Sequence, residues 1–285
     1  MKLHRWESIT AACALLLGML TACGADNAPA SMCTDPLHDS LAALITQPSA
    51  LSPEGFGEDS AEDPGDDSGE DSTDSLRTSA HDSSNDSGDS DKPQTVDAKT
   101  LVYCTTEAIG KLDGYRETQL LNGNEISSSR VNVNPLRVHI TLANPQAGDI
   151  EEVIMVESLT FAKLDGKWIE ATEDNPNSTV KALLNLPQSF QTQFNPKLRA
   201  AGTSESVIYT VEGTDTVLNQ PVLVLRAKIA SETGEFTSKY FVTKDYLVLR
   251  SQIIRADGST TTSEMTAAGE REDIANPILA QHNAQ

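Results

Sequence analysis

Apolar and polar residues alternate with a period of two in ten short segments of the chain after Gly114. Because successive side chains of a strand point to opposite faces of a sheet, this pattern predicts half-buried β-strands. Turn-forming residues separate the segments, and Asp165-Gly166 and Asp257-Gly258 are typical of type I′ hairpins. The predicted strands are Tyr115–Leu121, Ile126–Val133, Leu136–Ala143, Glu152–Phe161, Lys167–Glu170, Ser206–Glu212, Val222–Ile229, Glu235–Thr243, Leu247–Ala256 and Thr260–Ala268. Such a series predicts an antiparallel meander that is interrupted once.

Two further segments have helical periodicity. Val96–Leu112 carries apolar residues at the spacing of an amphipathic helix, with Thr95 or Asp97 available as its N-cap. In the interruption, Asn175–Ser204 has apolar residues three and four positions apart, and two prolines divide it into short helices. Helices beside a curved antiparallel sheet predict an α+β fold, a half-barrel whose concave face the helices cover.

The order of helix, strands, Asp165-Gly166-Lys167-Trp168, helical insert and second meander resembles the LolA/LppX-like (LppX/LprA/LprF/LprG-type) family of bacterial lipoproteins. The resemblance covers about Asp97 to Pro277. Its clearest parts are the Phe161–Trp168 hairpin, Val211-Glu212-Gly213, Val222–Ile229, Glu235–Val242, Asp245-Tyr246-Leu247 and Ile274-Ala275-Asn276-Pro277. It implies a cell-envelope protein with an apolar cavity that binds acyl chains of lipids, lipoproteins or glycolipids and carries them between membrane layers. The Cys33 segment and a long acidic tract depart from the typical member, so the ligand is not carried over.

Alternation also selects the residues that would face such a cavity. The candidate ligand-cavity residues are Val138, Ile140, Leu142, Leu183, Leu184, Phe190, Phe194, Leu225, Ile229, Phe236 and Tyr240. Each of them fits an ordinary core position as well as a cavity wall. Trp168 likewise fits packing at a sheet edge as well as a binding platform, and the sequence leaves both alternatives open.

Residues 1–22 are predicted to be a lipoprotein signal peptide. Lys2 and Arg5 precede the apolar run Ile9–Leu20, which is too short to span a bilayer, since a span takes about 20 apolar residues. The run ends in Leu20-Thr21-Ala22-Cys23, which resembles a lipobox, where the cysteine becomes the N-terminus and carries acyl chains such as palmitate. The alternative is an ordinary secretory signal with an incidental Cys23. The lipobox interpretation predicts an extracytoplasmic protein that is lipid-anchored to the cell membrane.

Residues 23–51 are the predicted lipidated N-terminus, with a short amphipathic helix at Thr34–Thr46. An oxidising compartment favours a disulfide between the two remaining cysteines, Cys33 and Cys104, over two free thiols. Residues 52–94 are predicted to be a disordered linker, because Asp, Ser, Gly and Glu dominate them and they have little apolar surface to bury. The alternatives for the linker are a calcium site, sugar modification or contact with a partner. Residues 95–277 form the predicted half-barrel domain and residues 278–285 a tail.

The charge excludes one class of partner. Of the net charge of −21, residues 54–91 contribute −13 and residues 95–285 only −7, and no basic patch occurs anywhere. Nucleic acid is therefore not an expected partner, because phosphate binding depends on clustered Lys and Arg. The sequence has no recognisable hydrolase, zinc-protease or phosphate-binding motif, and it predicts no metal and no cofactor. His139 flanks apolar neighbours in a predicted strand and is expected on the polar face.

These observations together predict a monomeric, non-enzymatic envelope lipoprotein that binds a hydrophobic, lipid-like ligand. Two rival interpretations stay open at this stage. One is a structural or interaction module whose half-barrel has a closed core. The other is a sensor that contacts an envelope signalling protein.

Overall fold

The computed structural model describes residue 33, residues 94–231 and residues 234–279. The predicted signal peptide, the lipobox, the helix Thr34–Thr46 and residues 52–93 of the acidic linker lie outside the described residues, as do residues 280–285. The chain divides into two units, residues 1–47 with 94–285 and residues 48–93. Every described residue belongs to the first unit.

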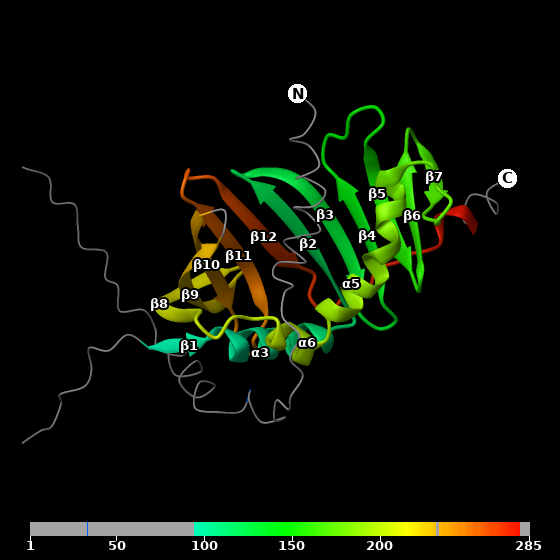
Figure 1. The fold of residues 1–285 in the computed structure, drawn as a ribbon. Coiled ribbons are helices and arrows are strands. Elements are labelled where there is room, and N and C mark those ends of the chain that lie inside the picture. Colours follow the sequence, from blue (N-terminus) through cyan, green and yellow to red (C-terminus); the bar gives the residue numbers. More distant parts are fainter. Residues whose placement is uncertain (1–32, 34–93, 232–233, 280–285) are drawn as a thin grey trace, which may run out of the picture. The chain divides into compact units, whose positions relative to one another are not determined.

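Twelve antiparallel strands form a single sheet in the described part of the chain. The strands are β1 (Thr95–Asp97), β2 (Gly114–Leu121), β3 (Asn124–Asn132), β4 (Arg137–Leu142), β5 (Ile150–Val156), β6 (Leu159–Leu164), β7 (Lys167–Glu170), β8 (Ile208–Val217), β9 (Gln220–Ser231), β10 (Gly234–Val242), β11 (Val248–Arg255) and β12 (Thr260–Thr266). Their order in the sheet is β1-β8-β9-β10-β11-β12-β2-β3-β4-β5-β6-β7. The sheet is open, with β1 and β7 at its edges, and it curves so that one face is concave (Figure 1).

The two predicted meanders, β2–β7 and β8–β12, join at a single strand pair. β12 pairs with β2 in a continuous register that runs from Thr261 opposite Leu121 to Thr266 opposite Arg116. The last strand of the sequence therefore lies at the centre of the sheet beside the first long one. This pairing brings side chains from the two halves of the domain together on the concave face.

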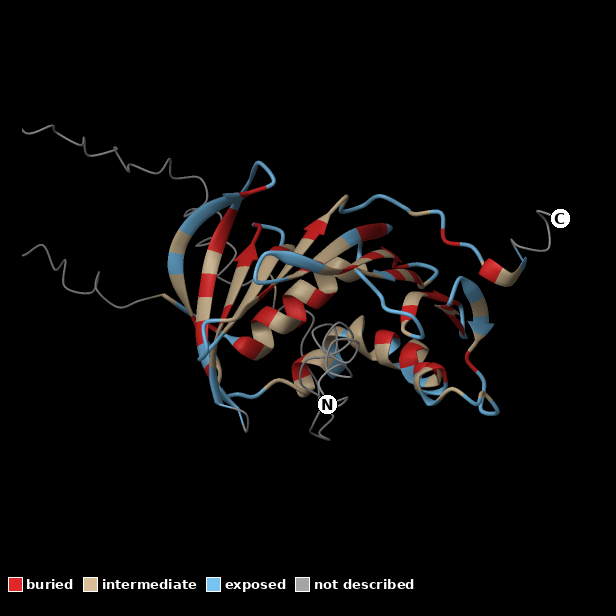
Figure 2. Ribbon diagram, turned by 90° about the horizontal axis from the view of Figure 1, so that it is seen from above, coloured by how far each residue is buried: buried red, intermediate tan, exposed pale blue. Residues whose placement is uncertain are grey.

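The helices lie against the concave face (Figures 1 and 2). α3 (Ala98–Gly110) begins after Asp97, whose Oδ1 accepts a hydrogen bond from the Thr100 amide at 2.9 Å, which confirms one of the two expected caps. The insert between β7 and β8 contains α4 (Ser178–Ala182), the 3-10 helix η1 (Leu183–Asn185), α5 (Leu186–Gln193) and α6 (Pro196–Ala201). α5 and α6 each have a proline in the first turn, and its missing N–H costs no hydrogen bond. The first N–H groups of a helix have no acceptor within the helix. No helix in the described ranges combines the length and apolarity needed to cross a membrane.

The concave face carries two apolar cores. One packs strands β2–β6 against α4, η1 and α5, and the fully buried Val131, Met155 and Val180 lie in it. The other packs β8–β10 against β1, α3 and α6 around Leu101 and Leu225. Buried residues of the helices face the sheet in Figure 2. An α+β half-barrel with helices over its concave face, as predicted, is therefore the observed architecture.

One predicted strand, Glu152–Phe161, is in fact a hairpin. β5 ends at Val156 and β6 begins at Leu159, so the polar pair between them is a tight turn. Glu157 has a φ of 60°, a left-handed conformation that is uncommon outside glycine. The prediction was wrong because no Gly, Asn or Pro marks the turn.

Three local predictions can be compared with backbone geometry. Val96, predicted as the start of the first helix, instead lies in β1 and pairs with Tyr209 of β8. Asp165 and Gly166 both have positive φ, as a type I′ turn requires. At Asp257-Gly258 only the glycine has positive φ, so β11 and β12 form the predicted hairpin with a different turn.

Candidate functional site

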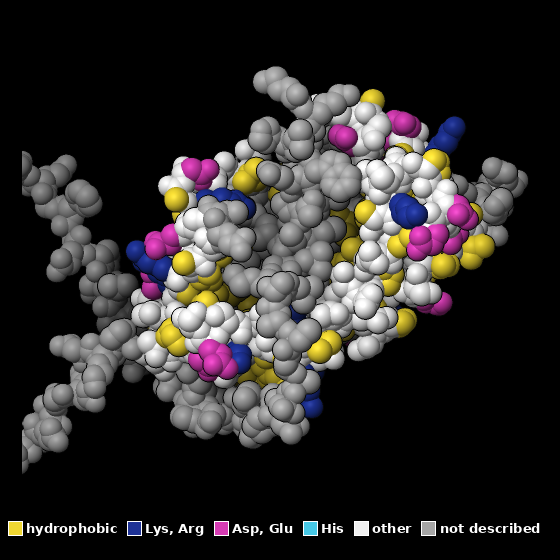
Figure 3. Space-filling model, viewed as in Figure 1, with side chains coloured by type: hydrophobic (Ala, Val, Ile, Leu, Met, Phe, Trp, Pro, Cys, Tyr) yellow, Lys and Arg dark blue, Asp and Glu magenta, His cyan; other side chains and the backbone are white. Residues whose placement is uncertain are grey.

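A cavity of about 160 Å³ lies on the concave face where the two cores meet. Its walls come from α3, from α6, from the C-terminal end of α5 and from strands β2, β10, β11 and β12. Hydrophobic side chains are visible on both sides of the centre of this face in Figure 3. The cavity depends on the pairing of β12 with β2, since each half of the domain supplies only part of the cavity wall.

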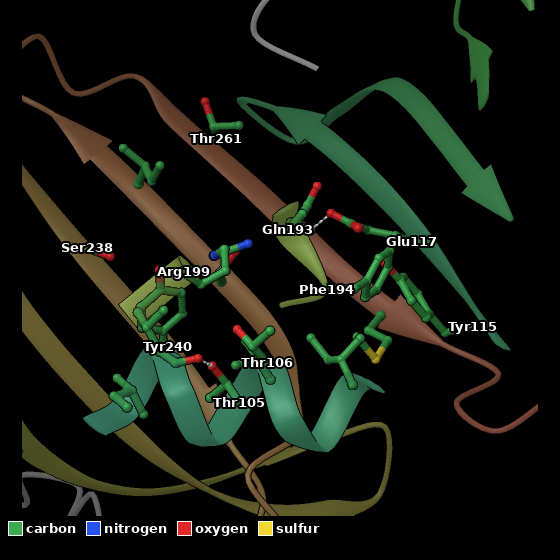
Figure 4. Close-up of a pocket in the computed structure, with 18 residues that line it drawn as sticks. Thr105, Thr106, Tyr115, Glu117, Gln193, Phe194, Arg199, Ser238, Tyr240 and Thr261 are labelled. Carbon is green, nitrogen blue, oxygen red and sulfur yellow. Dashed lines mark hydrogen bonds between the residues drawn. The ribbon is translucent and has the colours of Figure 1, made fainter. Parts of the chain in front are cut away.

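Half of the lining is hydrophobic (Figure 4). α3 contributes three of these side chains, and the strands and the end of α5 contribute the others. The hydrophobic lining residues are Leu101, Val102, Ile109, Tyr115, Phe194, Tyr240, Val248, Ile253 and Met265. A surface of this kind favours the apolar part of a ligand, because burial removes that part from water.

The other half of the lining is polar, and most of it consists of small hydroxyl side chains. Ser251 and Ser263 are direct cross-strand partners on β11 and β12, and Thr261 lies opposite Ile253 on the same pair. Ser238 on β10 accepts a hydrogen bond from the Tyr209 hydroxyl at 3.3 Å. The centre of the concave sheet therefore presents hydroxyl groups between two apolar cores.

Glu117 of β2 is the one acidic residue among those that line the cavity. Ser263 donates a hydrogen bond to its carboxylate, and Gln119 also interacts with it. These two donors favour the ionised form, but removal from water outweighs them and raises the pKa of Glu117 above its ordinary value. Burial likewise raises the pKa of the neighbouring Tyr115 hydroxyl. The carboxylate therefore sits where a negative charge is unfavourable.

Arg199 of α6 is the one basic residue in the lining. Asn195 caps this helix, because its side chain accepts hydrogen bonds from the amides of Lys197 and Leu198 at 3.1 and 3.2 Å. The cap sets where the helix begins and therefore the helical position of Arg199. Figure 4 shows Arg199 and Glu117 pointing into the cavity from different walls. Within the described ranges, no carboxylate lies within 4.0 Å of the Arg199 guanidinium. The cavity thus combines an apolar wall with a cation that has no ion-pair partner there.

A second group of titratable side chains lies on the convex face of β3–β6. His139 Nε2 is 2.6 Å from Glu152 Oε2, and Lys163 Nζ donates to Glu152 Oε1 at 2.8 Å. Arg130 contacts the other imidazole nitrogen, so neither ring nitrogen is left for a substrate. Burial lowers the pKa of His139, although Glu152 acts in the opposite direction. His139 lies on the polar face, as its alternation with buried Val138 and Ile140 predicts.

The described residues also bear on metals and on the cysteines. Among residues 33, 94–231 and 234–279, no group of three or more His, Cys, Asp or Glu is arranged to hold a metal ion. Cys33 and Cys104 are joined by a disulfide, with their Cα atoms 5.6 Å apart. Cys104 lies in α3 beside the lining residue Thr105, so the bridge attaches residue 33 to a wall of the cavity.

No family model matches the chain, and no curated protein matches it either. Similar solved structures include the lipoprotein LppX of Mycobacterium tuberculosis, with 12% identity and a TM-score of 0.43 over 62% of this chain and 97% of that one. LprF of Mycobacterium bovis has 10% identity and a TM-score of 0.40 over 63% and 96%. MucB in complex with MucA has 14% identity and a TM-score of 0.35 over 64% and 59%. The observed half-barrel is the arrangement that the LolA/LppX-like resemblance implies, and none of these similarities bears on the cavity residues.

Of the eleven predicted cavity residues, two line the cavity and nine do not. Phe194 and Tyr240 line the cavity. The other nine pack into the two cores, and they are Val138, Ile140, Leu142, Leu183, Leu184 and Phe190 in the first and Leu225, Ile229 and Phe236 in the second. Trp168 packs against the convex cluster formed by Ile154, Val156 and Ile274.

Sequence reasoning missed the charged and hydroxyl-bearing part of the wall. Glu117 and Gln119 alternate with Arg116 and Thr118 in a polar strand, where acidic residues are expected to face solvent. Arg199 lies in a short helix whose docking face the sequence does not define. One local signal was available, because Glu117, Gln119 and Leu121 share a face with Tyr115 by the period of two.

Proposed function

We propose that this chain is an extracytoplasmic, lipid-anchored binding protein that holds the apolar part of a lipid-like molecule in the concave cavity. The observation that carries the proposal is a cavity half lined by hydrophobic side chains on the open face of a curved sheet. The sequence from Lys2 to Cys23 supports the location, since a lipobox cysteine is acylated outside the cytoplasm. The binding protein acts as a monomer, without catalysis and without a cofactor.

The cavity volume narrows the kind of molecule. Pockets for drug-sized ligands occupy roughly 300–1,000 Å³, whereas a cavity of about 150 Å³ holds a benzene-sized molecule. The observed volume of about 160 Å³ suits part of one acyl chain or a small ring rather than several chains at once. Each methylene buried there contributes about 0.8 kcal/mol, so a short segment is enough for measurable binding.

Two neighbouring isoleucines of β11 provide a matched test. Ile253 lines the cavity, whereas Ile254 points to the other face of the strand, and both are half-buried. The full chain carrying Cys23→Ser, which has no attached acyl chain to compete, is titrated with a fluorescent fatty-acid probe. Ile253→Trp fills the cavity and is expected to weaken binding at least tenfold, while Ile254→Trp leaves it within twofold of the parent. Equal effects of both substitutions, or no uptake by the parent at micromolar concentration, would refute cavity binding.

The anchor requires a separate experiment. Cells that express the chain are labelled with a palmitate analogue and separated into membrane and soluble fractions. The parent is expected to be labelled and membrane-bound, and Cys23→Ser to be unlabelled. An unlabelled parent would contradict lipidation without affecting the cavity.

One observation favours a second candidate function, a structural or interaction module with a closed half-barrel. Nine of the eleven predicted cavity residues pack into cores, and the remaining space is small. The same titration separates the two functions, because a closed module takes up no probe.

A further inference from the structure

The cavity wall contains two opposite charges that an ordinary apolar core would not have. Arg199 and Glu117 face the same space from α6 and β2, and no ion pair joins them within the described residues. We propose that the cavity selects an amphiphile with an anionic head, a carboxylate or a phosphate, and that Arg199 binds this head. The proposal rests on the proposed function and adds the chemical class of its ligand.

The guanidinium of Arg199 is suited to this role by its chemistry and its surroundings. It presents a planar fork of N–H donors that matches the two oxygens of a carboxylate or phosphate, and such paired hydrogen bonds are among the strongest in proteins. Arg199 is half-buried, and within the described residues its side chain has no carboxylate partner. A partly desolvated cation without a counter-ion is unfavourable, and an anionic head would remove that cost.

The lining around Arg199 can complete the contact. Figure 4 shows Arg199 on the side of the cavity where Ser238 and Tyr240 lie, with Phe194 on the other side, and the charge of Arg199 also acts on the Tyr115 hydroxyl. Hydroxyl groups donate hydrogen bonds to anionic oxygens, whereas the aromatic side favours an acyl chain. The wall therefore has separate places for a head and for a tail.

Glu117 determines where the negative head can lie. Its carboxylate is held by Ser263 and Gln119, and the hydroxyl of Tyr115 lies within the influence of both Glu117 and Arg199. When ionised it repels a second anion, which directs the head toward Arg199. Replacing it by the isosteric, neutral glutamine is expected to tighten binding of an anionic amphiphile severalfold.

Calorimetric titration with three ten-carbon compounds tests the proposal. The full chain carrying Cys23→Ser is titrated with decanoate, decyl phosphate and neutral decanol, each below the concentration at which it aggregates. We expect both anions to bind at least tenfold more tightly than decanol, and the stronger of the two identifies the head. Arg199→Gln is expected to reduce the ratio of anion to decanol affinity to about one, and Arg199→Lys to restore part of it.

The control substitution is Lys197→Gln, which removes a positive charge from the exposed face of the same helix and lies outside the lining. It is expected to keep the full preference for the anions. Thermal unfolding of every variant shows that the fold is retained. If decanol binds as tightly as the anions, or if the preference survives Arg199→Gln, the anionic head is refuted while cavity binding stands. If none of the three compounds binds, the proposed function fails as well.

Discussion

Ser263 of β12 donates a hydrogen bond to the carboxylate of Glu117 across the strand pair that joins the two halves of the sheet. This contact spans 146 positions in sequence and lies on the concave face, inside the cavity wall. The serine and Gln119 supply neutral donors only. They do not compensate for the loss of water around the carboxylate, so burial keeps the pKa of Glu117 above its ordinary value.

Glu117 is therefore expected to make the domain less stable as the pH rises. In the unfolded chain Glu117 loses its proton near pH 4.5, whereas the folded protein holds the proton to higher pH. Since the folded state binds more protons in this interval, the contribution is fully favourable below pH 4.5 and is lost as the pH rises through the raised pKa. Urea unfolding of the parent and Glu117→Gln between pH 4 and 8 should show the variant gaining relative stability with pH.

The matched control is Glu125→Gln, which removes an exposed carboxylate from the neighbouring strand β3. Its stability should follow that of the parent across the same pH range. A constant difference between Glu117→Gln and the parent at every pH would show that burial does not act on this carboxylate.

The elements that could be predicted from the sequence are those set by neighbours along the chain. The first helix begins where Asp97 can cap it, and four residues of β9 share one face because the period is two, namely Leu223, Leu225, Ala227 and Ile229. β1 could not be found in this way, because its three residues carry no period and become a strand only by pairing with β8. The turn at Glu157 was missed for a similar reason, since its left-handed backbone is imposed by the pairing of β5 with β6.

Contacts between residues that are far apart in sequence matter more for the candidate site than for the fold. Phe194 and Tyr240 could be named from hydrophobicity, but their position in the cavity depends on how α5 and β10 lie relative to each other. The contribution of Glu117 depends on the register of β2 with β12, and that of Arg199 on the docking of α6 against α3. The period of two along β2 places Glu117 on the face of Tyr115, but no local signal gives the register with β12 or the docking of α6, so the polar residues of the wall were not named.

Gly114, the first residue of β2, is expected to tolerate no side chain. A Cβ at this position would lie 2.4 Å from the carbonyl oxygen of Glu270 and 2.6 Å from that of Val131, so backbone would have to move. Its own carbonyl also accepts a hydrogen bond from Gly269 at 2.8 Å, which holds the segment after β12 in place. Gly114→Ala should therefore lower the free energy of unfolding by about 1–3 kcal/mol, the usual cost of overpacking.

Gly110, four residues earlier at the end of α3, provides the opposite case. A Cβ there would meet no atom within 4 Å, and its backbone is helical. Gly110→Ala should raise stability by about 0.5–1 kcal/mol, because alanine loses less conformational freedom on folding. Thermal unfolding compares the two alanine variants with the parent, and shifts of the same sign would contradict the packing around Gly114.

The disulfide between Cys33 and Cys104 is expected to stabilise the half-barrel. It closes a loop with a sequence separation of 71, and the chain-entropy estimate for a loop of this length is about 4 kcal/mol. Because Cys104 is almost fully buried in the second core and Cys33 packs against it, Cys33→Ala/Cys104→Ala also removes two sulfur atoms from the packing there. Urea unfolding of the parent with and without a reductant measures the effect of the bond alone, since both sulfur atoms are then retained. We expect the reductant to lower the stability of the parent by up to about 4 kcal/mol and to leave the double variant unchanged.

A parent whose unfolding midpoint does not respond to complete reduction, verified by alkylation of Cys33 and Cys104, would show that the bridge contributes nothing to the folded domain.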